Sequence, residues 1–447
     1  MRAAARISVL SLILASIPLG LAACNSDAES DDDPAPVENT ATRLARLDPE
    51  GRQVAVGPRT GRWAEDRPGP NESELTDEQR AEMARLAELG YASGVHAGGG
   101  RSGVFRHTPE STAAGMLQFT SAHAPTSMLL DDKGNILHRW QYGFRKAFPE
   151  RPGTLRGATF WRRTHVFENG DLLAIFEGVA ILKLDKDSNL IWSRLISAHH
   201  DMALQPDGSI WVLTREPTII PRVHATQPVL EDFISLLDAN GEETRRISVL
   251  EALENSDYAD HWDGGLGIGG DLFHVNSLER LDGSIAQRNP AFREGNLLIS
   301  SRHLDHVAVL DPETETIVWA LKGTFNAQHD PQILANGNML LFDNNSLGKA
   351  SRVVELDPAS GEERWVYEGS VIEPFYSETC GLAQRLPGGN TLITESDYGR
   401  AFEVTASGDI VWEFYNPFRA GDDNQYIATM MEMKRLPADF PTDWLDR

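Results

Sequence analysis

Hydrophobic and polar residues alternate in short runs over most of the chain, from Gly103 to the C-terminus. Pairs such as Asn-Gly, Asp-Gly and Gly-Asn separate these runs. Alternation with a period of two predicts strands, and the glycine-containing pairs predict the tight turns between them. Helical periodicity is absent from this region, so the pattern predicts an all-β domain over residues 103–447.

The turns define a repeat that occurs six times. Each copy reads as strand, turn, strand, strand, turn, strand, and most copies end at a tryptophan. Taken from the first turn to the end, the copies run over Asp131–Trp140 (incomplete), Glu168–Trp192, Gln205–Arg246, Glu279–Trp319, Leu334–Trp365 and Leu386–Trp412. Ends spaced roughly 45 to 75 residues apart are typical of propeller blades. The sequence therefore predicts a six-bladed β-propeller, with the tryptophans packed between blades rather than against a cofactor.

The predicted ring needs one more strand, because the first copy lacks its opening strand. Thr429–Pro437 resembles Thr379–Pro387, the opening strand of the last full copy, yet nothing follows it that could complete another blade. We expect this C-terminal strand to pair within blade one and close the ring. Closure of this kind removes an open sheet edge, at which chains aggregate.

The N-terminal segment predicts export. Arg2 and Arg6 precede an apolar run over Ile7–Leu21 that is too short to span a membrane, and Leu-Ala-Ala-Cys ends at Cys24. These four residues resemble the bacterial lipobox, which implies a signal peptide over 1–23 and lipidation of Cys24. The protein would then be anchored to the bacterial envelope, at the outer membrane or in the periplasm. An ordinary cleaved signal with a chance cysteine is the alternative.

Two segments connect this signal to the propeller. Residues 24–73 are rich in Asp, Glu, Pro and Ser and predict a disordered tether. Residues 74–102 begin with a capping-box pair, Thr76 and Gln79, followed by apolar residues at helical spacing and then Gly90. They predict a short helix and a lead-in to the propeller.

The charge of the chain narrows its partners. With 41 Lys+Arg and 66 Asp+Glu, the formal net charge is −25, which argues against nucleic acid and anionic lipid. An anionic substrate would have to be attracted by a local group of cations. Lipidation of Cys24 would leave Cys380 as the only thiol, so no internal disulfide is predicted. We expect Cys380 to be buried rather than reactive.

Three histidines occupy equivalent places in the repeat. In a propeller the opening strand of each blade lines the central channel, so equivalent residues converge on the axis. The histidines precede the first turn of their blades by seven or eight residues, in the pairs His200–Asp207, His274–Asp282 and His329–Asn336. Gly381 and Met431 hold this place in the last blade and the closing strand, and Arg302 ends the second strand of the His274 blade. We expect the three histidines and Arg302 to meet at one mouth of the channel.

Two kinds of site use several histidines. Zinc is one, but Arg302 would place a fixed positive charge beside the metal. A tetrahedral oxyanion is the other, because each imidazole and the guanidinium can donate to a different oxygen. An imidazole can also attack sulfur when a neighbour fixes its tautomer. We expect the remaining histidines of the domain to be packed or solvent-facing, namely His107, His138, His165, His261, His303 and His306.

The segments around these residues resemble the signature segments of the bacterial arylsulfate sulfotransferases. The matching segments are His199–Asp201, Asp271–Ser277, Ile299–His303, Gln328–Asp330 and Asn344–Asn345. The resemblance covers roughly Gly103 to Pro417. It implies an enzyme that takes a sulfuryl group from an aryl sulfate and passes it to a phenol by a ping-pong route, with no cofactor and no nucleotide sulfate donor.

The resemblance also implies roles for individual residues. His329 would be the nucleophile that becomes sulfohistidine, and Asn276 would orient it, with Thr379 assisting. His200, His274 and Arg302 would bind the sulfate oxygens. Strand alternation points His199 away from the channel. The chain lacks the disulfide near the site and the N-terminal β-domain of the better-known members, so it fits a shorter, divergent branch.

Two other functions compete with this one. A membrane-tethered propeller that binds proteins or envelope polymers without catalysis is the main alternative. A quinone-cofactor dehydrogenase is less consistent with the sequence, because the acidic calcium-binding cluster and vicinal cysteines typical of that group are missing. The sequence does not specify the natural donor and acceptor or the oligomeric state.

Overall fold

The computed structural model describes residues 96–97, 101–151, 156–345, 347–370, 373–420 and 426–445, all within one compact unit of the chain. The predicted signal peptide, Cys24, the tether and the helix after Thr76 lie outside these residues. Within the described part, no helix is long and apolar enough to cross a membrane.

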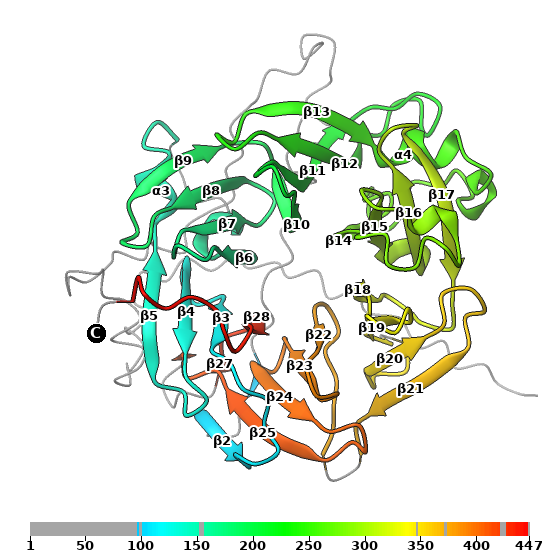
Figure 1. Ribbon diagram of the computed structural model, residues 1–447. Coiled ribbons are helices and arrows are strands. Elements are labelled where there is room, and N and C mark those ends of the chain that lie inside the picture. Colours follow the sequence, from blue (N-terminus) through cyan, green and yellow to red (C-terminus); the bar gives the residue numbers. More distant parts are fainter. Residues whose placement is uncertain are drawn as a thin grey trace, which may run out of the picture. The chain divides into compact units, whose positions relative to one another are not determined.

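Six antiparallel sheets surround a central axis, which confirms the predicted six-bladed β-propeller (Figure 1). Strands are numbered outward from the axis within blades two to five. Blade two consists of β6 (Arg163–Val166), β7 (Leu172–Phe176), β8 (Ala180–Leu184) and β9 (Leu190–Arg194). Blade three consists of β10 (Ala198–Leu204), β11 (Ile210–Thr218), β12 (Val229–Leu237) and β13 (Glu243–Ser248). Blade four consists of β14 (Val275–Arg280), β15 (Leu297–Ser301), β16 (His306–Asp311) and β17 (Thr316–Lys322). Blade five consists of β18 (His329–Ile333), β19 (Met339–Asp343), β20 (Arg352–Leu356) and β21 (Glu363–Glu368).

Blades one and six combine strands from both ends of the domain. Blade one consists of β28 (Met430–Arg435), β3 (Leu117–Ser121), β4 (Thr126–Leu130) and β5 (Ile136–Gln141), with β28 antiparallel to β3. Blade six consists of β22 (Leu382–Arg385), β23 (Thr391–Glu395), β24 (Arg400–Val404), β25 (Ile410–Tyr415) and the additional outer strand β2 (Gly103–His107). A separate small sheet contains β1 (His96–Ala97), β27 (Tyr426–Ile427) and β26 (Arg419–Ala420). The C-terminal strand is therefore innermost in a blade whose other strands come from the start of the domain.

Apolar strands in the middle of each blade form the core. β7 reads Leu-Leu-Ala-Ile-Phe and is buried along its whole length, because both faces of a blade pack against neighbouring blades. Leu173 and Ile175 of this strand belong to the same buried cluster as Ile210 and Val212 of blade three. Burial at roughly 25 cal/mol per Å² of apolar surface makes these junctions the main source of stability.

Tryptophans that end four of the blades each form a hydrogen bond to the next blade. The indole Nε1 of Trp140 donates to the carbonyl of Gly170 in blade two, and that of Trp192 donates to Ala239 in blade three. Trp365 donates to Ala406 in blade six, and Trp412 donates to Asp132 in blade one. The predicted inter-blade packing role of these tryptophans is thus observed as a recurring hydrogen bond.

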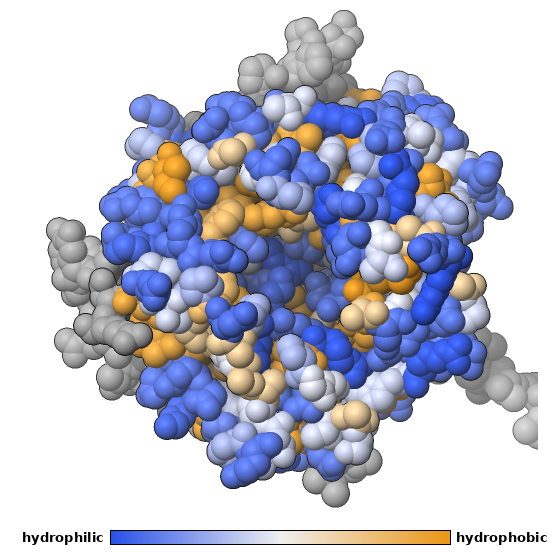
Figure 2. Space-filling model, in the orientation of Figure 1, coloured by the Kyte–Doolittle hydropathy of each residue, from blue (hydrophilic) through white to orange (hydrophobic). Residues whose placement is uncertain are grey.

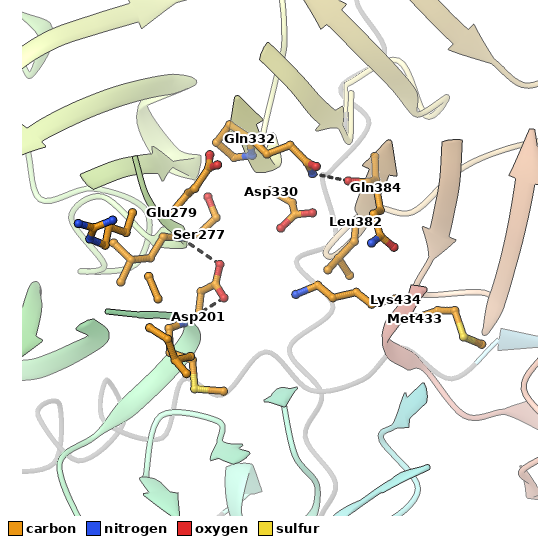
Figure 3. A pocket seen from close by; sticks show the side chains of 16 residues that line it. Asp201, Ser277, Glu279, Asp330, Gln332, Leu382, Gln384, Met433 and Lys434 are labelled. Atoms are coloured by element: carbon orange, nitrogen blue, oxygen red, sulfur yellow. Dashed lines mark hydrogen bonds between the residues drawn. The ribbon is translucent and has the colours of Figure 1, made fainter. Parts of the chain in front are cut away.

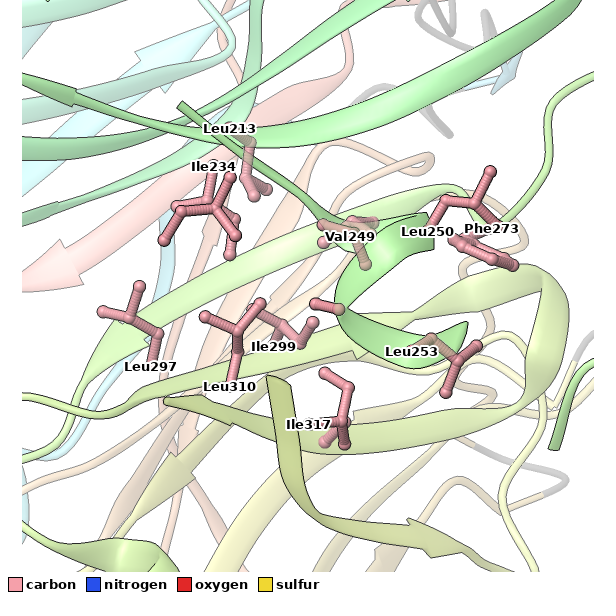
Figure 4. Packing of buried hydrophobic residues seen from close by; sticks show 14 of the residues in the cluster. Leu213, Ile234, Val249, Leu250, Leu253, Phe273, Leu297, Ile299, Leu310 and Ile317 are labelled. Carbon is pink, nitrogen blue, oxygen red and sulfur yellow. The ribbon is translucent and has the colours of Figure 1, made fainter. Parts of the chain in front are cut away.

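Short helices lie in the connections between strands. They are α3 (Phe144–Ala147), α4 (Val249–Glu254), and the 3₁₀ helices η2 (Arg156–Thr159), η3 (Ala259–His261), η4 (Pro290–Phe292) and η5 (Arg302–Leu304). Ser248 caps α4 by accepting a hydrogen bond from the backbone N–H of Glu251. Val249, Leu250 and Leu253 of α4 are buried in a cluster formed with residues of blades three and four (Figure 4). This packing anchors the connection that leads from blade three to the first site residues of blade four.

Candidate functional site

The inner strands are distorted where the predicted site residues lie. The pairing register shifts in β10, β14 and β18, in each case at or beside a predicted histidine. His200 and His274 have left-handed φ values of 48° and 54°. Such backbone costs a non-glycine residue on the order of 1–3 kcal/mol and is found at functional sites. Bulges of this kind re-aim side chains, and here they turn histidines of separate blades toward one region.

The predicted histidines are buried together. His200, His274 and His329 are 2%, 3% and 2% exposed, and the ring centroids of His200 and His274 lie 4.9 Å apart. Burial lowers the pKa of His329 well below 6.5, and the positive charges of Arg302 and Arg162 lower it further. The structure therefore brings the predicted histidines and Arg302 within interaction range and adds Arg162, which the sequence analysis did not include.

The ring of His329 is held in one tautomer. Its Nδ1 lies 2.7 Å from Oδ1 of Asn344 and 3.1 Å from the carbonyl oxygen of Ala327. The Asn344 amide is oriented by its own Nδ2, which donates to the carbonyls of Ser377 and Cys380. Both neighbours of His329 Nδ1 are acceptors, so Nδ1 carries the proton and Nε2 carries the lone pair. Nε2 is buried and has no hydrogen-bonding partner within the described part of the chain.

Asn276, the residue expected to orient His329, acts one residue away from it. Its Nδ2 donates to the carbonyl of Gln328 at 2.8 Å, so it fixes the backbone before His329 rather than the ring. The ring contact belongs to Asn344, which stands in a family-like segment but had been given no role. Asn344 follows β19 as Arg302 follows β15, so both lie at the end of a second strand, and this shared position is a signal that could have found it.

Thr379 and Cys380 lie beside Asn344 without contacting the His329 ring. The Thr379 hydroxyl donates to Oδ1 of Asp397 at 2.7 Å and not to the His329 ring that it was expected to help orient. Cys380 is 4% exposed, and burial raises the pKa of its thiol. The prediction that Cys380 is buried is confirmed.

His274 forms a pair with a buried carboxylate. Its Nδ1 lies 2.8 Å from Oδ2 of Asp271, and its backbone N–H donates to Oδ1 of the same residue. Burial lowers the pKa of His274 to about 4, although the Asp271 charge opposes this shift. Among the described residues, Asp271, His274 and His303 form the one group of three potential metal ligands within 4.8 Å of one another. The 2.8 Å contact is a hydrogen-bond distance, and the group is not the trio of axial histidines considered for zinc.

His199 is buried beside His200. Its Nδ1 lies 2.9 Å from Nδ1 of His200, and its Nε2 lies 3.4 Å from Oδ1 of Asp232 on β12. His200 has left-handed backbone, which interrupts regular strand alternation between the two histidines. The Glu177 carboxylate lies 3.6 Å from Nδ1 of His200 and favours a proton on that nitrogen. His199 is therefore a buried support for His200.

Two guanidinium groups face the histidines. Arg302 begins η5, its backbone N–H donates to the carbonyl of His274, and its guanidinium makes no hydrogen bond within the described residues. Arg162 is 3% exposed and immediately precedes β6. It lies seven residues before Asn169 of the first turn in blade two, the spacing that identified His200 and His329. The same count along the sequence would therefore have found Arg162.

A cavity of about 360 Å³ lies further along the same inner strands (Figure 3). It is lined by residues that follow the site histidines in blades three, four and five, together with residues of β22 and β28. Arg163 is a buried neighbour with ion pairs to Asp201 at 2.9 Å, Glu432 at 3.2 Å and Asp330 at 3.4 Å. Figure 2 shows a hollow at the centre of the ring with hydrophilic residues at its base.

A sequence profile of the arylsulfotransferases (ASST) matches residues 163–417, more than half of the chain. The chain belongs to the arylsulfotransferase family. The family match starts one residue after Arg162 and includes His200, His274, Arg302 and His329. No curated protein matches the chain at a significant level.

Several solved structures match the chain at low identity. A Bacteroides caccae protein of unknown function is 12% identical with a TM-score of 0.48, over 72% of this chain and 98% of its own. A streptogramin B lyase is 13% identical with a TM-score of 0.41, over 77% of this chain and 94% of its own. The WD40 propeller domain of Doa1 is 10% identical with a TM-score of 0.40, over 76% and 96%. At this similarity the structures carry no argument about the activity of this arylsulfotransferase-family chain.

Proposed function

We propose that the protein transfers a sulfuryl group from an aryl sulfate to a phenol through a covalent intermediate on His329. The observation that carries the proposal is the state of the His329 ring. Nδ1 is bound to two acceptors, while the buried Nε2 has a lone pair and no partner among the described residues. A neutral, oriented imidazole beside two guanidinium groups is suited to attack an anionic sulfur centre.

In the first step the lone pair of His329 Nε2 attacks sulfur, and the bond between sulfur and the aryl oxygen breaks. The ring becomes positively charged, and the acceptors Asn344 and Ala327 on Nδ1–H stabilise that charge. Donation from the Arg302 guanidinium stabilises the negative charge on the sulfuryl oxygens. The phenolate takes up a proton and departs as a phenol.

His274 supplies that proton from Nε2. The Asp271 carboxylate on Nδ1 supports the charged imidazolium, and an anion bound at Nε2 favours the same charged form. Before the transfer, this Nε2–H donates to a sulfuryl oxygen, as His200 does when it is protonated. In the second step an acceptor phenol attacks sulfur, the nitrogen–sulfur bond of His329 breaks, and the phenolic proton returns to His274.

The experiment uses the purified protein with 4-nitrophenyl sulfate as donor and phenol as acceptor. We expect nitrophenol release that depends on phenol, and a sulfuryl adduct on His329, found by mass spectrometry, when donor is supplied alone. His329→Ala should abolish both signals. His165→Ala is the matched control, because His165 is a largely buried histidine of β6 outside the site. Nitrophenol release that survives His329→Ala would show that another group performs the reaction.

A further inference from the structure

We propose that Arg162 is a second guanidinium ligand for the sulfuryl oxygens, in addition to Arg302. This inference rests on the proposed sulfuryl transfer. In the repeat, Arg162 holds the place in blade two that His200 holds in blade three and His329 holds in blade five. The fold directs residues at this place to the axis, so blade two contributes a guanidinium where the other two blades contribute imidazoles.

The surroundings of Arg162 leave part of its guanidinium unsatisfied. Nη1 is buried and has no hydrogen-bonding partner among the described residues. The nearest carboxylate is Glu177, whose Oε2 lies 3.7 Å from Nε, and Arg215 also approaches Glu177 at 3.7 Å. One carboxylate thus faces two buried arginines. A buried positive charge that is only partly compensated is costly, and a bound anion is the partner that would complete it.

The neighbouring arginine shows the contrast. Arg163 is equally buried but reaches three carboxylates, at 2.9, 3.2 and 3.4 Å. Its Nη1 and Nη2 each donate to a carboxylate, and its Nε lies 2.9 Å from Oδ1 of Asp201. Of these two consecutive buried arginines, Arg163 lies within 3.4 Å of three carboxylates, whereas Nη1 of Arg162 has no hydrogen-bonding partner among the described residues.

The charge of Arg162 acts on histidines of two other blades. Its positive charge lowers the pKa of His329 in blade five, and also that of His200 in blade three, in both cases in addition to burial. This influence agrees with the repeat position of Arg162, which directs it to the axis, and with the buried Nη1 that has no partner among the described residues. There it can donate to an oxygen of the group that moves between the aryl oxygen and His329 Nε2.

This placement gives Arg162 a function in the transfer. A migrating sulfuryl group has three oxygens, and their charge rises as the bond to the aryl oxygen breaks. Arg302 and Arg162 together provide fixed donors for two of these oxygens, which does not depend on the protonation of any imidazole. The arrangement favours sulfate esters over carboxylate-bearing compounds, which offer only two oxygens in a plane.

The first test measures binding of inorganic sulfate by titration calorimetry to His329→Ala, with and without Arg162→Met. We expect sulfate binding to weaken on the order of 10- to 100-fold when Arg162 is replaced, the range for loss of hydrogen bonds to a charged group. Arg162→Lys should lose less, because it keeps the charge but not the planar fork. It also serves as the informative variant if the methionine protein does not fold.

Arg215→Met is the matched comparison, because it removes the other guanidinium that approaches Glu177. Sulfate binding should change by less than about threefold, since Arg215 does not hold the place seven residues before a first turn that Arg162, His200 and His329 share. An equal loss in the Arg215 and Arg162 variants would mean that only net charge matters, and it would overturn the assignment of Arg162 as a ligand.

Transfer assays separate this inference from the function on which it rests. In protein that retains His329, Arg162→Met should raise the donor KM and slow adduct formation, each by about the factor by which it weakens sulfate binding. If the Arg162→Met protein kept the transfer rate, sulfate affinity and donor KM of the wild type, the ligand role of Arg162 would be refuted. The proposed sulfuryl transfer would stand. Sulfate binding that depends on Arg162 in a protein without any transfer would refute sulfuryl transfer and leave an anion site.

Discussion

Replacing Asn344 with alanine tests how the His329 ring, the proposed nucleophile, is oriented. The change removes the acceptor at 2.7 Å from Nδ1 and leaves the carbonyl of Ala327 at 3.1 Å. The tautomer should therefore survive, but the ring loses one hydrogen bond at the moment when it becomes positively charged. Hydrogen bonds to charged groups are worth about 1.5–3 kcal/mol, which corresponds to a roughly 10- to 150-fold slower formation of the adduct.

The assay is single-turnover release of nitrophenol from 4-nitrophenyl sulfate, followed as a function of pH. Asn344→Asp should retain more activity and shift the acid limb to higher pH, because a carboxylate raises the pKa of His329. Asn345→Ala is the control, since the Asn345 side chain bonds the Ala350 carbonyl and not the histidine. If Asn344→Ala formed the adduct at the wild-type rate, the ring contact would have no function in catalysis.

Three further results are expected. Stability should fall as the pH drops from about 6.5 toward 4, because burial lowers the pKa of His165, His274 and His306 to about 4. In this range the unfolded chain binds more protons than the folded one. Thermal unfolding as a function of pH measures the effect, and a melting temperature that does not change with pH would contradict it. Arg163→Met should cost on the order of 3–5 kcal/mol in denaturant unfolding, since it leaves the buried Asp201 and Glu432 and the partly buried Asp330 without their shared partner. A loss below about 1 kcal/mol would show that these pairs are not needed for stability. We also propose export and lipid anchoring through Cys24, so Cys24→Ser should move the protein from the membrane fraction to the soluble fraction, and an unchanged distribution would rule out the anchor.

The repeat explains why the fold and most of the site could be predicted from sequence. Turn pairs recur at regular intervals, and a fixed spacing from each turn identifies the residue that faces the axis. This count selected His200 and His329, which are both buried, and it also applies to Arg162, seven residues before Asn169. Arg162 was not predicted, because a guanidinium rather than an imidazole occupies the shared position in blade two.

Backbone strain explains what the sequence could not reveal. The contact between His199 and His200 forms where His200 has a left-handed φ, and non-glycine residues in this region have no reliable local sequence signal. Strand alternation, which is a sound rule for regular strands, therefore did not predict this contact. The outer strand β2 was also not anticipated, because a short segment ahead of the first repeat has no partner that the sequence alone identifies.

The melting temperature of an Arg162 variant, measured with and without sulfate, distinguishes a ligand-binding residue from a structural one. Arg163, Arg400 and Arg435 have carboxylate oxygens at 2.9, 2.7 and 3.0 Å, whereas the nearest carboxylate to Arg162 is 3.7 Å away. An incompletely paired buried charge is retained at the expense of stability, so Arg162→Met should raise the melting temperature in sulfate-free buffer by roughly 2–4 °C. Added sulfate should then raise the melting temperature of the wild type but not of the variant, because only the wild type binds it tightly. A fall in melting temperature without sulfate, comparable to that of Arg163→Met, would instead make Arg162 a structural residue.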